Sequence, residues 1–165
     1  MIMRHVVDTN VPIVANGGTR SRTVERIASP ECRIKAIEFL ELLVTQGRII
    51  LDFGGEIQAE YLRHLNPHGQ PGVGDRFLQV VLNSGPTRVE RVELGKTEGE
   101  FDDFPNDPNL TAFDRSDRKF VAAGRKAKAS IANATDSDWL EHHAALLANH
   151  VRVHFICGCD KKKWF

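Results

Sequence analysis

Two acidic residues follow apolar segments that have the composition of buried strands. Asp8 comes directly after residues 5–7, and Asp136 comes after residues 131–135. A carboxylate at the end of a buried strand loses hydration, so it usually has a hydrogen-bonding, helix-capping or metal-binding role. If the two strands are parallel neighbours, both carboxylates face one crevice, because sites form beyond the carboxyl ends of such strands.

Two further acids belong to segments that should run beside this crevice. Glu60 lies on the helix expected after Leu51, and Asp117 opens the helix that precedes Asp136. Four carboxylates at close range repel one another unless a cation lies among them. Oxygen ligands suit hard cations, so we expect Mg²⁺ or Mn²⁺ as the cofactor. Such a centre activates water for in-line attack on a phosphodiester, which indicates hydrolysis of a nucleic-acid backbone.

Helix capping is the main alternative for the acids that lie near a helix start. Asp8 could cap a helix that begins near Val11, since aspartate is a preferred N-cap residue. Asp114, three residues before Asp117, is itself a good cap in the sequence Asp-Arg-Ser-Asp. If Asp114 is the cap, Asp117 can face the site.

The elements that must position these acids follow from the hydrophobic spacing. Between residues 30 and 46, apolar side chains recur three and four residues apart, with a proline near the start and Gly47 past the end, which predicts an amphipathic helix. Its expected apolar members are Ile34, Ile37, Leu40, Leu43 and Val44. Residues 48–52 predict a buried strand.

The rest of the chain alternates in the same way. Strands are expected at residues 5–8, 88–94, 130–134 and 151–157, and helices from near residue 11 and at 56–64, 76–83, 116–128 and 138–148. Strands that alternate with helices predict an α/β domain with a mostly parallel central sheet. Residues 16–22 and 68–75 are expected loops, and residues 95–112 an irregular connection long enough to be functional.

The acidic motifs resemble, in order, those of PIN domains, the metal-dependent ribonuclease fold of many toxin–antitoxin toxins and RNA-processing enzymes. The stretch VVDTN at residues 6–10 resembles the opening of the family. IQAEY at 57–61 resembles its helical glutamate motif, DRKFVAAG at 117–124 its third acidic motif, and ATDSDWL at 134–140 its fourth. The resemblance extends from residue 5 to about residue 156.

The resemblance implies a fold, an activity and a set of site residues. The fold would be a three-layer α/β/α domain with strand order 3-2-1-4-5, and the activity would be endoribonucleolytic hydrolysis of RNA. The catalytic and metal-binding residues would be Asp8, Glu60, Asp117 and Asp136, with Asp138 as an auxiliary metal ligand. Residues that orient these carboxylates by hydrogen bonds would be Thr9, Asn10 and Thr135.

Two of these assignments have close competitors in the sequence. Glu56 lies one helical turn before Glu60 on a similar face, and we prefer Glu60 because the Glu-Tyr pair matches the motif. Asp136 and Asp138 alternate, so only one would lie on a given face if the strand continued. Both can point into the crevice if Asp138 caps the next helix, and a purely capping role for Asp138 is the alternative.

Function has alternatives too. By the resemblance, the chain could be a toxin with an antitoxin or other regulatory partner, and it could form a homodimer. A non-catalytic PIN-like module that binds RNA or protein would keep the acids for structure. A phosphoryl-transfer enzyme with Asp8 as nucleophile would want a second acid where Asn10 stands. Residues 66–75 and 95–112 extend beyond the family's short toxins and could shape substrate choice or cover a partner surface.

Net charge does not indicate a polyanionic partner, because Lys plus Arg and Asp plus Glu both number 22. Arginines gathered at the rim of a site can nevertheless bind nucleic acid. The arginines that flank the proposed acids, and from which we expect contacts with the phosphate backbone, are Arg20, Arg22, Arg115, Arg118 and Arg125. Ordinary surface charge is the alternative for each of them.

The composition is that of a folded, soluble protein, with 165 residues, 41% of them hydrophobic and 27% charged. We expect one domain over residues 1–158 and a basic, aromatic tail at 159–165. The apolar N-terminal run is too short for a signal peptide or a membrane span, so the expected location is the cytoplasm. Three cysteines predict no disulfide framework, and Cys157 is expected in the core at the end of the last strand.

Overall fold

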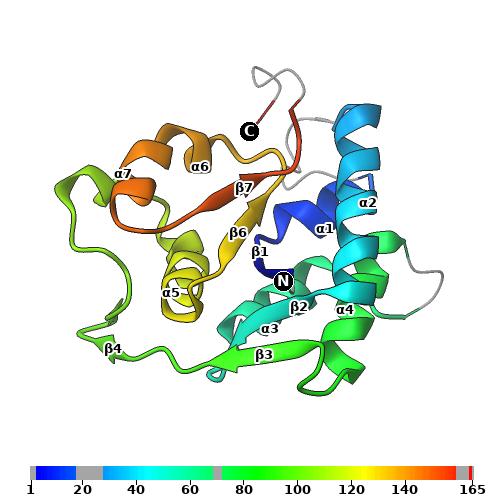
Figure 1. The fold of residues 1–165 in the computed structure, drawn as a ribbon, viewed down its shortest axis with the longest axis horizontal. Coiled ribbons are helices and arrows are strands. Elements are labelled where there is room, and N and C mark those ends of the chain that lie inside the picture. Colours follow the sequence, from blue (N-terminus) through cyan, green and yellow to red (C-terminus); the bar gives the residue numbers. More distant parts are fainter. Residues whose placement is uncertain (1–2, 18–27, 69–71, 159–163, 165) are drawn as a thin grey trace.

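The computed structural model describes residues 3–17, 28–68, 72–158 and 164, and its centre is a five-stranded parallel sheet in the order β3-β2-β1-β6-β7 (Figure 1). The strands are β1 (Arg4–Val7), β2 (Arg48–Asp52), β3 (Val89–Val92), β6 (Ser130–Asn133) and β7 (Val153–Phe155). Counted along the chain, this order is 3-2-1-4-5. The predicted α/β class and strand order are therefore confirmed, and all neighbouring strands of this sheet are parallel.

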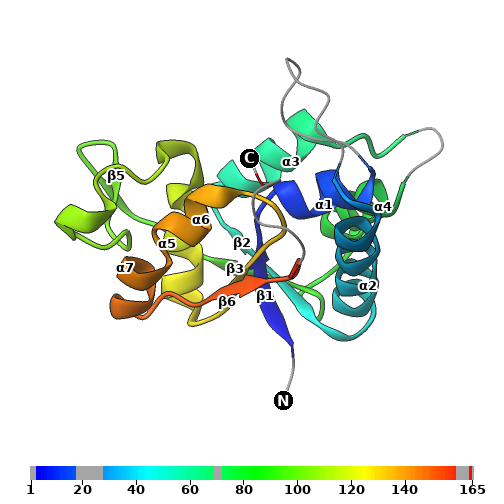
Figure 2. The same cartoon turned by 90° about the horizontal axis from the view of Figure 1, so that it is seen from above.

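Helices cover both faces of the sheet, as Figure 2 shows. On one face α1 (Asn10–Ala15), α2 (Pro30–Gln46) and α4 (Val73–Asn83) pack against one another. On the other face lie α5 (Arg118–Ala127), α6 (Ser137–Glu141) and α7 (His143–Ala148). Of these helices, α5 packs on β1 and β2. Helix α3 (Glu56–His64) follows β2 and contacts both α4 and α5.

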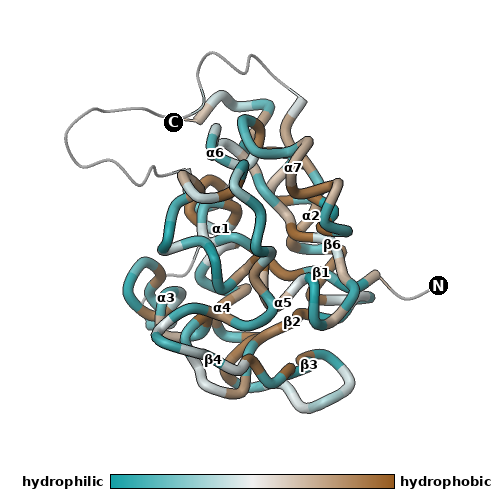
Figure 3. Tube along the Cα trace, turned by 90° about the vertical axis from the view of Figure 1, so that its left-hand side faces the viewer, coloured by the Kyte–Doolittle hydropathy of each residue, from teal (hydrophilic) through white to brown (hydrophobic). Residues whose placement is uncertain are grey.

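The core lies in and against this sheet. Val6 and Val7 of β1 are completely buried, as are residues 49–51 of β2 and Ile131 of β6. A parallel sheet covered on both faces buries successive residues of a strand, so its strands are continuous apolar runs without alternation. Figure 3 shows the same hydrophobic character along β2.

Helix α2 has the predicted bounds because its ends carry local signals. Ser29 accepts a hydrogen bond from the backbone N–H of Cys32, Pro30 begins the helix, and Gly47 follows it. The predicted apolar stripe is partly wrong, since Ile34 is 54% exposed and the buried face is formed by Cys32, Ala36, Phe39, Leu40 and Leu43. Helix α2 has 17 residues, and no helix in the described part of the chain is long and apolar enough to cross a membrane.

Helix α4 begins earlier than predicted, at Val73 within the expected loop 68–75. Asp75 accepts a hydrogen bond from the backbone N–H of Gly72 at 3.0 Å, which closes the first turn. The backbone N–H of Gly74 donates to Asn16 Oδ1 at 2.8 Å, and a Cβ at Gly74 would collide with the carbonyl of Pro12. Glycine at this position therefore lets α4 lie directly against α1.

The connection at residues 95–112 is more ordered than predicted. Strands β4 (Lys96–Thr97) and β5 (Glu100–Phe101) pair in antiparallel fashion, and a short 3-10 helix, η1, covers Pro108–Leu110. Glu98 and Gly99 between the strands have φ of +53° and +81°, which is the backbone of a primed hairpin turn.

Two predicted helices differ in detail from the structure. The helix expected at 116–128 begins with a 3-10 turn, η2 (Arg115–Asp117), before α5. The helix expected at 138–148 is divided at His142, whose φ and ψ of −99° and 7° interrupt the regular helix between α6 and α7.

The C-terminal region corrects two expectations. Cys32 at the start of α2 is joined to Cys157 by a disulfide, with Cα atoms 5.1 Å apart, although no disulfide was expected from the cysteine count. Cys157 is buried near the end of β7, as predicted. Of the expected tail, only Trp164 is described; it is 5% exposed and stacks on Phe155, with ring centroids 6.0 Å apart. Trp164 therefore belongs to the packed domain.

The first prediction concerns His5 of β1. Its Nε2 lies 3.1 Å from His154 Nδ1, and burial, helped by the positive charges of His154 and Arg152, lowers the pKa of His5 to about 4. Because the unfolded chain takes up this proton near pH 6.5, the free energy of unfolding should fall as the pH drops from about 6.5 to 4. After allowance for solvent screening, we expect about 1 kcal/mol from this group.

Chemical denaturation at several pH values would test this. His5→Gln should show a shallower loss of stability between pH 6.5 and 4 than the wild type, whereas His68→Gln, at an exposed position, should follow the wild-type profile. Parallel profiles for wild type and His5→Gln would contradict the prediction.

Candidate metal centre

Three of the predicted acids converge at the carboxyl edge of the sheet. Asp8, Asp117 and Asp136 each offer a carboxylate oxygen, and these oxygens lie within 4.8 Å of one another. Asp8 and Asp117 are completely buried, and Asp136 is half-buried. The residues come from three separate segments: the end of β1, the junction of η2 and α5, and the end of β6.

The pairing of β1 with β6 brings Asp8 and Asp136 to the same edge. In this parallel pair Val6 lies opposite Ile131 and Val7 opposite Ala132. The backbone N–H of Asp8 continues the ladder by donating to the carbonyl of Ala132 at 3.1 Å. Both chains then leave the sheet at the same level, so the acids that follow the strands meet.

The carboxylate of Asp8 is held by two donors. Its Oδ1 accepts from the backbone N–H of Asn10 at 2.9 Å, and its Oδ2 accepts from Trp139 Nε1 at 2.7 Å. Asn10 is the first residue of α1 and Thr9 is its N-cap, so Asp8 accepts a bond from the first turn of the helix but is not the N-cap that the alternative proposed. Trp139 is fully buried and packs edge-on against Phe113, with ring centroids 5.0 Å apart. The sequence analysis gave Trp139 no role at the site, because a tryptophan in an apolar position is typical of a hydrophobic core and its indole N–H does not indicate a particular acceptor.

The side chain of Asn10 links the ends of the two central strands. Its Oδ1 accepts from the backbone N–H groups of Ala134 at 2.8 Å and Thr135 at 3.3 Å, and its Nδ2 donates to Asn133 Oδ1 at 2.7 Å. Asn133 also bonds Asp136, accepting from its N–H at 3.2 Å and donating to its carbonyl at 3.1 Å. The side chains of Asn10 and Asn133 therefore join the ends of β1 and β6, whereas the predicted support of a carboxylate comes from the backbone N–H of Asn10, which donates to Asp8.

Asp136 and Asp138 take different roles. Asp136 caps α6, because its Oδ1 accepts from the backbone N–H of Asp138 at 3.0 Å. Asp138 points elsewhere: it accepts from the N–H of Asp114 at 3.0 Å and pairs with His142 at 3.1 Å. Asp138 therefore stands outside the three-acid group, in a separate cluster with Glu141 and His142. The expected capping role of Asp138 is also wrong, since Asp136 is the cap.

Glu60 lies next to the three-acid group with partners of its own. Its Oε2 accepts a hydrogen bond from the hydroxyl of Thr9, and its Oε1 pairs with Lys119 Nζ at 2.9 Å. Glu60 is 3% exposed, whereas Glu56 is only half-buried and pairs with Lys96 at 2.9 Å near the surface. The preference for Glu60 over Glu56 agrees with this burial, and Thr9 supports Glu60. Sequence reasoning gave Lys119 no role.

The capping alternative at η2 is resolved in favour of Asp114. Its Oδ1 accepts from both the backbone N–H and the hydroxyl of Ser116, each at 2.9 Å. Asp114 is exposed and serves the turn, whereas Asp117 is completely buried in the three-acid group. Asp52, which ends β2, is likewise a cap: its carboxylate accepts from the N–H groups of Glu56 and Ile57 at 3.0 Å each.

The pKa of Tyr61 is raised by burial and by the negative charge of the carboxyl edge of the sheet. Its hydroxyl donates to the carbonyl of Val7 at 2.6 Å, within the buried end of β1. Burial raises the pKa of Tyr61 well above 10, and the negative charges of Glu60, Asp8 and Asp52 raise it further. A region that resists a further negative charge favours a cation, and carboxylate oxygens are the donors that Mg²⁺ and Mn²⁺ prefer. The residues present therefore fit such an ion.

The described arginines hold the 95–112 segment. Arg115 and Arg118 both pair with Glu100, and Arg118 also donates to the carbonyls of Thr111 and Phe113. Arg125 donates to the carbonyl of Asp103 at 3.3 Å. The side chain of Arg118 is 12% exposed and that of Arg115 is 73% exposed. Phosphate contacts were expected from all three arginines, but Arg118 and Arg125 donate hydrogen bonds to backbone carbonyls of the protein. Arg20 and Arg22 lie outside the described residues.

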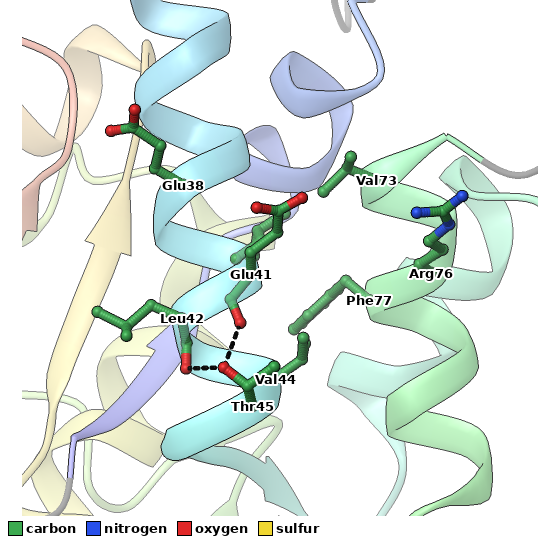
Figure 4. A pocket seen from close by; sticks show the side chains of 9 residues that line it. Glu38, Glu41, Leu42, Val44, Thr45, Val73, Arg76 and Phe77 are labelled. Carbon is green, nitrogen blue, oxygen red and sulfur yellow. Dashed lines mark hydrogen bonds between the residues drawn. The ribbon is translucent and has the colours of Figure 1, made fainter.

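Two open pockets lie away from the three acids. The larger, of about 590 Å³, runs between α2 and α4, and Figure 4 shows Glu41 and Phe77 on its two sides. The other, of about 480 Å³, is bordered by the 95–112 segment, Arg115 and Arg118. None of the three converging acids lines either pocket.

Comparisons of the chain with protein-family models, with curated proteins and with solved structures returned no match.

The second prediction concerns Asn10. Asn10→Ala removes three buried hydrogen bonds and leaves Asn133 and two backbone amides short of a partner. The free energy of unfolding should therefore fall by about 2–4 kcal/mol. Urea denaturation would measure the loss, and Asn83→Ala, which removes one exposed hydrogen bond to Gln79, should cost less than about 0.5 kcal/mol. Equal losses for the two variants would contradict the bridging role of Asn10.

Proposed function

We propose that this chain is a metal-dependent endoribonuclease that hydrolyses RNA phosphodiesters. The observation that carries the proposal is the convergence of Asp8, Asp117 and Asp136 to within 4.8 Å from three separate segments. The order of the acidic motifs, which resembles that of PIN domains, supports it, and so does the parallel sheet with β1 at its centre. A Mg²⁺ or Mn²⁺ ion bound there would supply an activated water and neutralise charge on the scissile phosphate.

The protein's own residues hold the proposed ligands in place. Trp139 and the amide of Asn10 each use one acceptor position on a different oxygen of Asp8. The cap bond from Asp138 N–H fixes Asp136 in the same way. Ligand orientation is therefore set before any ion binds, which is what tight coordination needs.

The proposals on substrate and partners rest on the resemblance to PIN domains. We propose RNA as the substrate class, and a cytoplasmic toxin controlled by an antitoxin or another regulatory protein as the biological role. A homodimer is part of the same proposal. Of Arg115, Arg118 and Arg125, Arg115 alone is exposed, and it is our candidate for contact with the RNA backbone.

One observation favours a second candidate, a non-catalytic PIN-like module that binds RNA or protein. Glu60, the fourth predicted ligand, is paired with Lys119. A retained structural site would have such internal compensation. Normal RNA binding without any Mn²⁺ binding at millimolar concentration would favour this candidate over the nuclease.

The third prediction is the loss of cleavage in the variants Asp8→Asn and Asp136→Asn. Each removes one negative charge and one anionic ligand while keeping the side-chain shape, but the amide nitrogen in Asp8→Asn cannot accept, so one of the bonds from Asn10 N–H and Trp139 Nε1 is lost. Cleavage of a mixed pool of single-stranded and structured RNA in Mn²⁺ should slow by at least about 100-fold. Circular dichroism should show an unchanged fold.

Asp52→Asn is the matched control, because Asp52 is also a buried acid at the carboxyl end of a strand but caps α3. Its cleavage rate should stay within about threefold of the wild type. The nuclease assignment fails if Asp8→Asn and Asp136→Asn cleave the RNA pool at the wild-type rate.

The fourth prediction tests the toxin role. Induced expression of the wild-type chain in bacteria should slow growth, and co-expression of its regulatory partner should restore it. Asp8→Asn, expressed to the same level, should leave growth unchanged, because the proposed toxicity requires cleavage. Equal growth defects from the wild type and Asp8→Asn would argue against toxicity through the metal centre.

A further inference from the structure

A buried ion pair adjoins the three-acid group. Lys119 and Glu60 are 8% and 3% exposed, and their Nζ and Oε1 atoms are 2.9 Å apart. Lys119 lies in the first turn of α5, two residues after Asp117, and its ammonium also donates to the carbonyl of Ser116. Thr9, which donates to Glu60, directly follows Asp8. The two partners of Glu60, Lys119 and Thr9, are thus close in the sequence to Asp117 and Asp8.

Both oxygens of Glu60 have donors directed at them. Lys119 donates to Oε1, and the hydroxyl of Thr9 donates to Oε2. A divalent cation coordinated by Glu60 would lie within a few ångströms of the Lys119 ammonium. In a buried setting with little solvent screening, two positive charges at that separation repel strongly. The ion pair therefore makes Glu60 a poor metal ligand.

Charge balance leads to the same conclusion. A buried charge has to be paired, and a carboxylate beside other carboxylates needs a positive partner. Lys119 supplies that partner to Glu60 as part of the fold, irrespective of the concentration of metal ions. The oxygens of Asp8, Asp117 and Asp136, which lie within 4.8 Å of one another, therefore form the group at which we expect the ion.

We propose that the centre binds a single divalent cation through Asp8, Asp117 and Asp136, and that the Lys119 ammonium occupies the place at Glu60 where a second cation would otherwise bind. This inference rests on the proposed metal centre. Glu60 is then a buried structural residue and not a ligand: through Thr9 and Lys119 it contacts the segment after β1 and the first turn of α5. This proposal replaces the expectation from the sequence that Glu60 coordinates the metal ion.

The fifth prediction is tested by counting Mn²⁺ ions on the full chain. Isothermal titration with MnCl₂, with free Mn²⁺ followed by electron paramagnetic resonance, gives both stoichiometry and affinity. The wild type should bind one Mn²⁺ per chain at this centre. Asp8→Asn should weaken that binding at least tenfold, because it removes a ligand charge.

The decisive variant is the double substitution Glu60→Gln with Lys119→Met. It removes both charges of the pair at once and keeps similar volumes, so no unpaired charge is left buried. Its Mn²⁺ affinity should stay within about threefold of the wild type, with one ion bound. Lys119→Met alone, if it folds, leaves Glu60 without the ammonium and should bind a second Mn²⁺.

A surface ion pair between α3, the helix of Glu60, and β4 supplies the matched control. Glu56 and Lys96 have the same 2.9 Å separation but are partly exposed, so Glu56→Gln with Lys96→Met should leave both stoichiometry and affinity unchanged. Two Mn²⁺ ions on the wild type, or a more than tenfold loss of affinity in the Glu60 and Lys119 double variant, would overturn the inference while leaving the metal centre intact. Absence of Asp8-dependent Mn²⁺ binding would overturn the metal centre and the inference together.

Discussion

The crowding of buried carboxylates at the carboxyl edge of the sheet is the constraint on which the surrounding structure depends. Carboxylates that are buried close together lose their hydration and repel one another, so hydrogen-bond donors or positive charges of the protein have to compensate them. Asp8 receives the indole of Trp139 from α6, and Glu60 receives the ammonium of Lys119 from α5. Asp136 receives a backbone amide at the start of α6. The donors Trp139, Lys119 and the Asp138 N–H all belong to α5 or α6. The same contacts therefore compensate the buried carboxylates and hold these two helices against the carboxyl edge of the sheet.

The central position of β1 makes this crowding possible. Because β1 pairs in parallel with both β2 and β6, the segments that leave these strands start at neighbouring points. The polar side chains at these points have different roles. Asp52 is used as a helix cap, Asn10 and Asn133 join the ends of β1 and β6, and Asp8 is directed at the other acids. A strand-end position alone therefore does not identify a site residue, since Asp52 and Asp8 have the same position and different partners.

The arginines illustrate how helix geometry separates residues that are close in sequence. Arg118 and Arg125 are seven positions apart on α5, so they lie on one face of the helix, and both contact the 95–112 segment. Asp117 and Lys119, on either side of Arg118, face the buried edge instead. The 95–112 segment is thus held by cations that the sequence had suggested for the phosphate backbone.

The sequence by itself determined the α/β class, the bounds of α2 and β2, the strand order through the motif resemblance, and the convergence of Asp8, Asp117 and Asp136. The α/β class and the element bounds follow from apolar periodicity and caps, which depend on nearby residues, whereas the strand order was implied only by the resemblance. Only the tertiary structure decided the partners. Trp139 meets Asp8 from 131 positions away, Lys119 meets Glu60 from 59, and Cys32 meets Cys157 from 125. Contacts over such separations depend on how whole elements pack against each other, and the periodicity of a single segment contains no information about that packing.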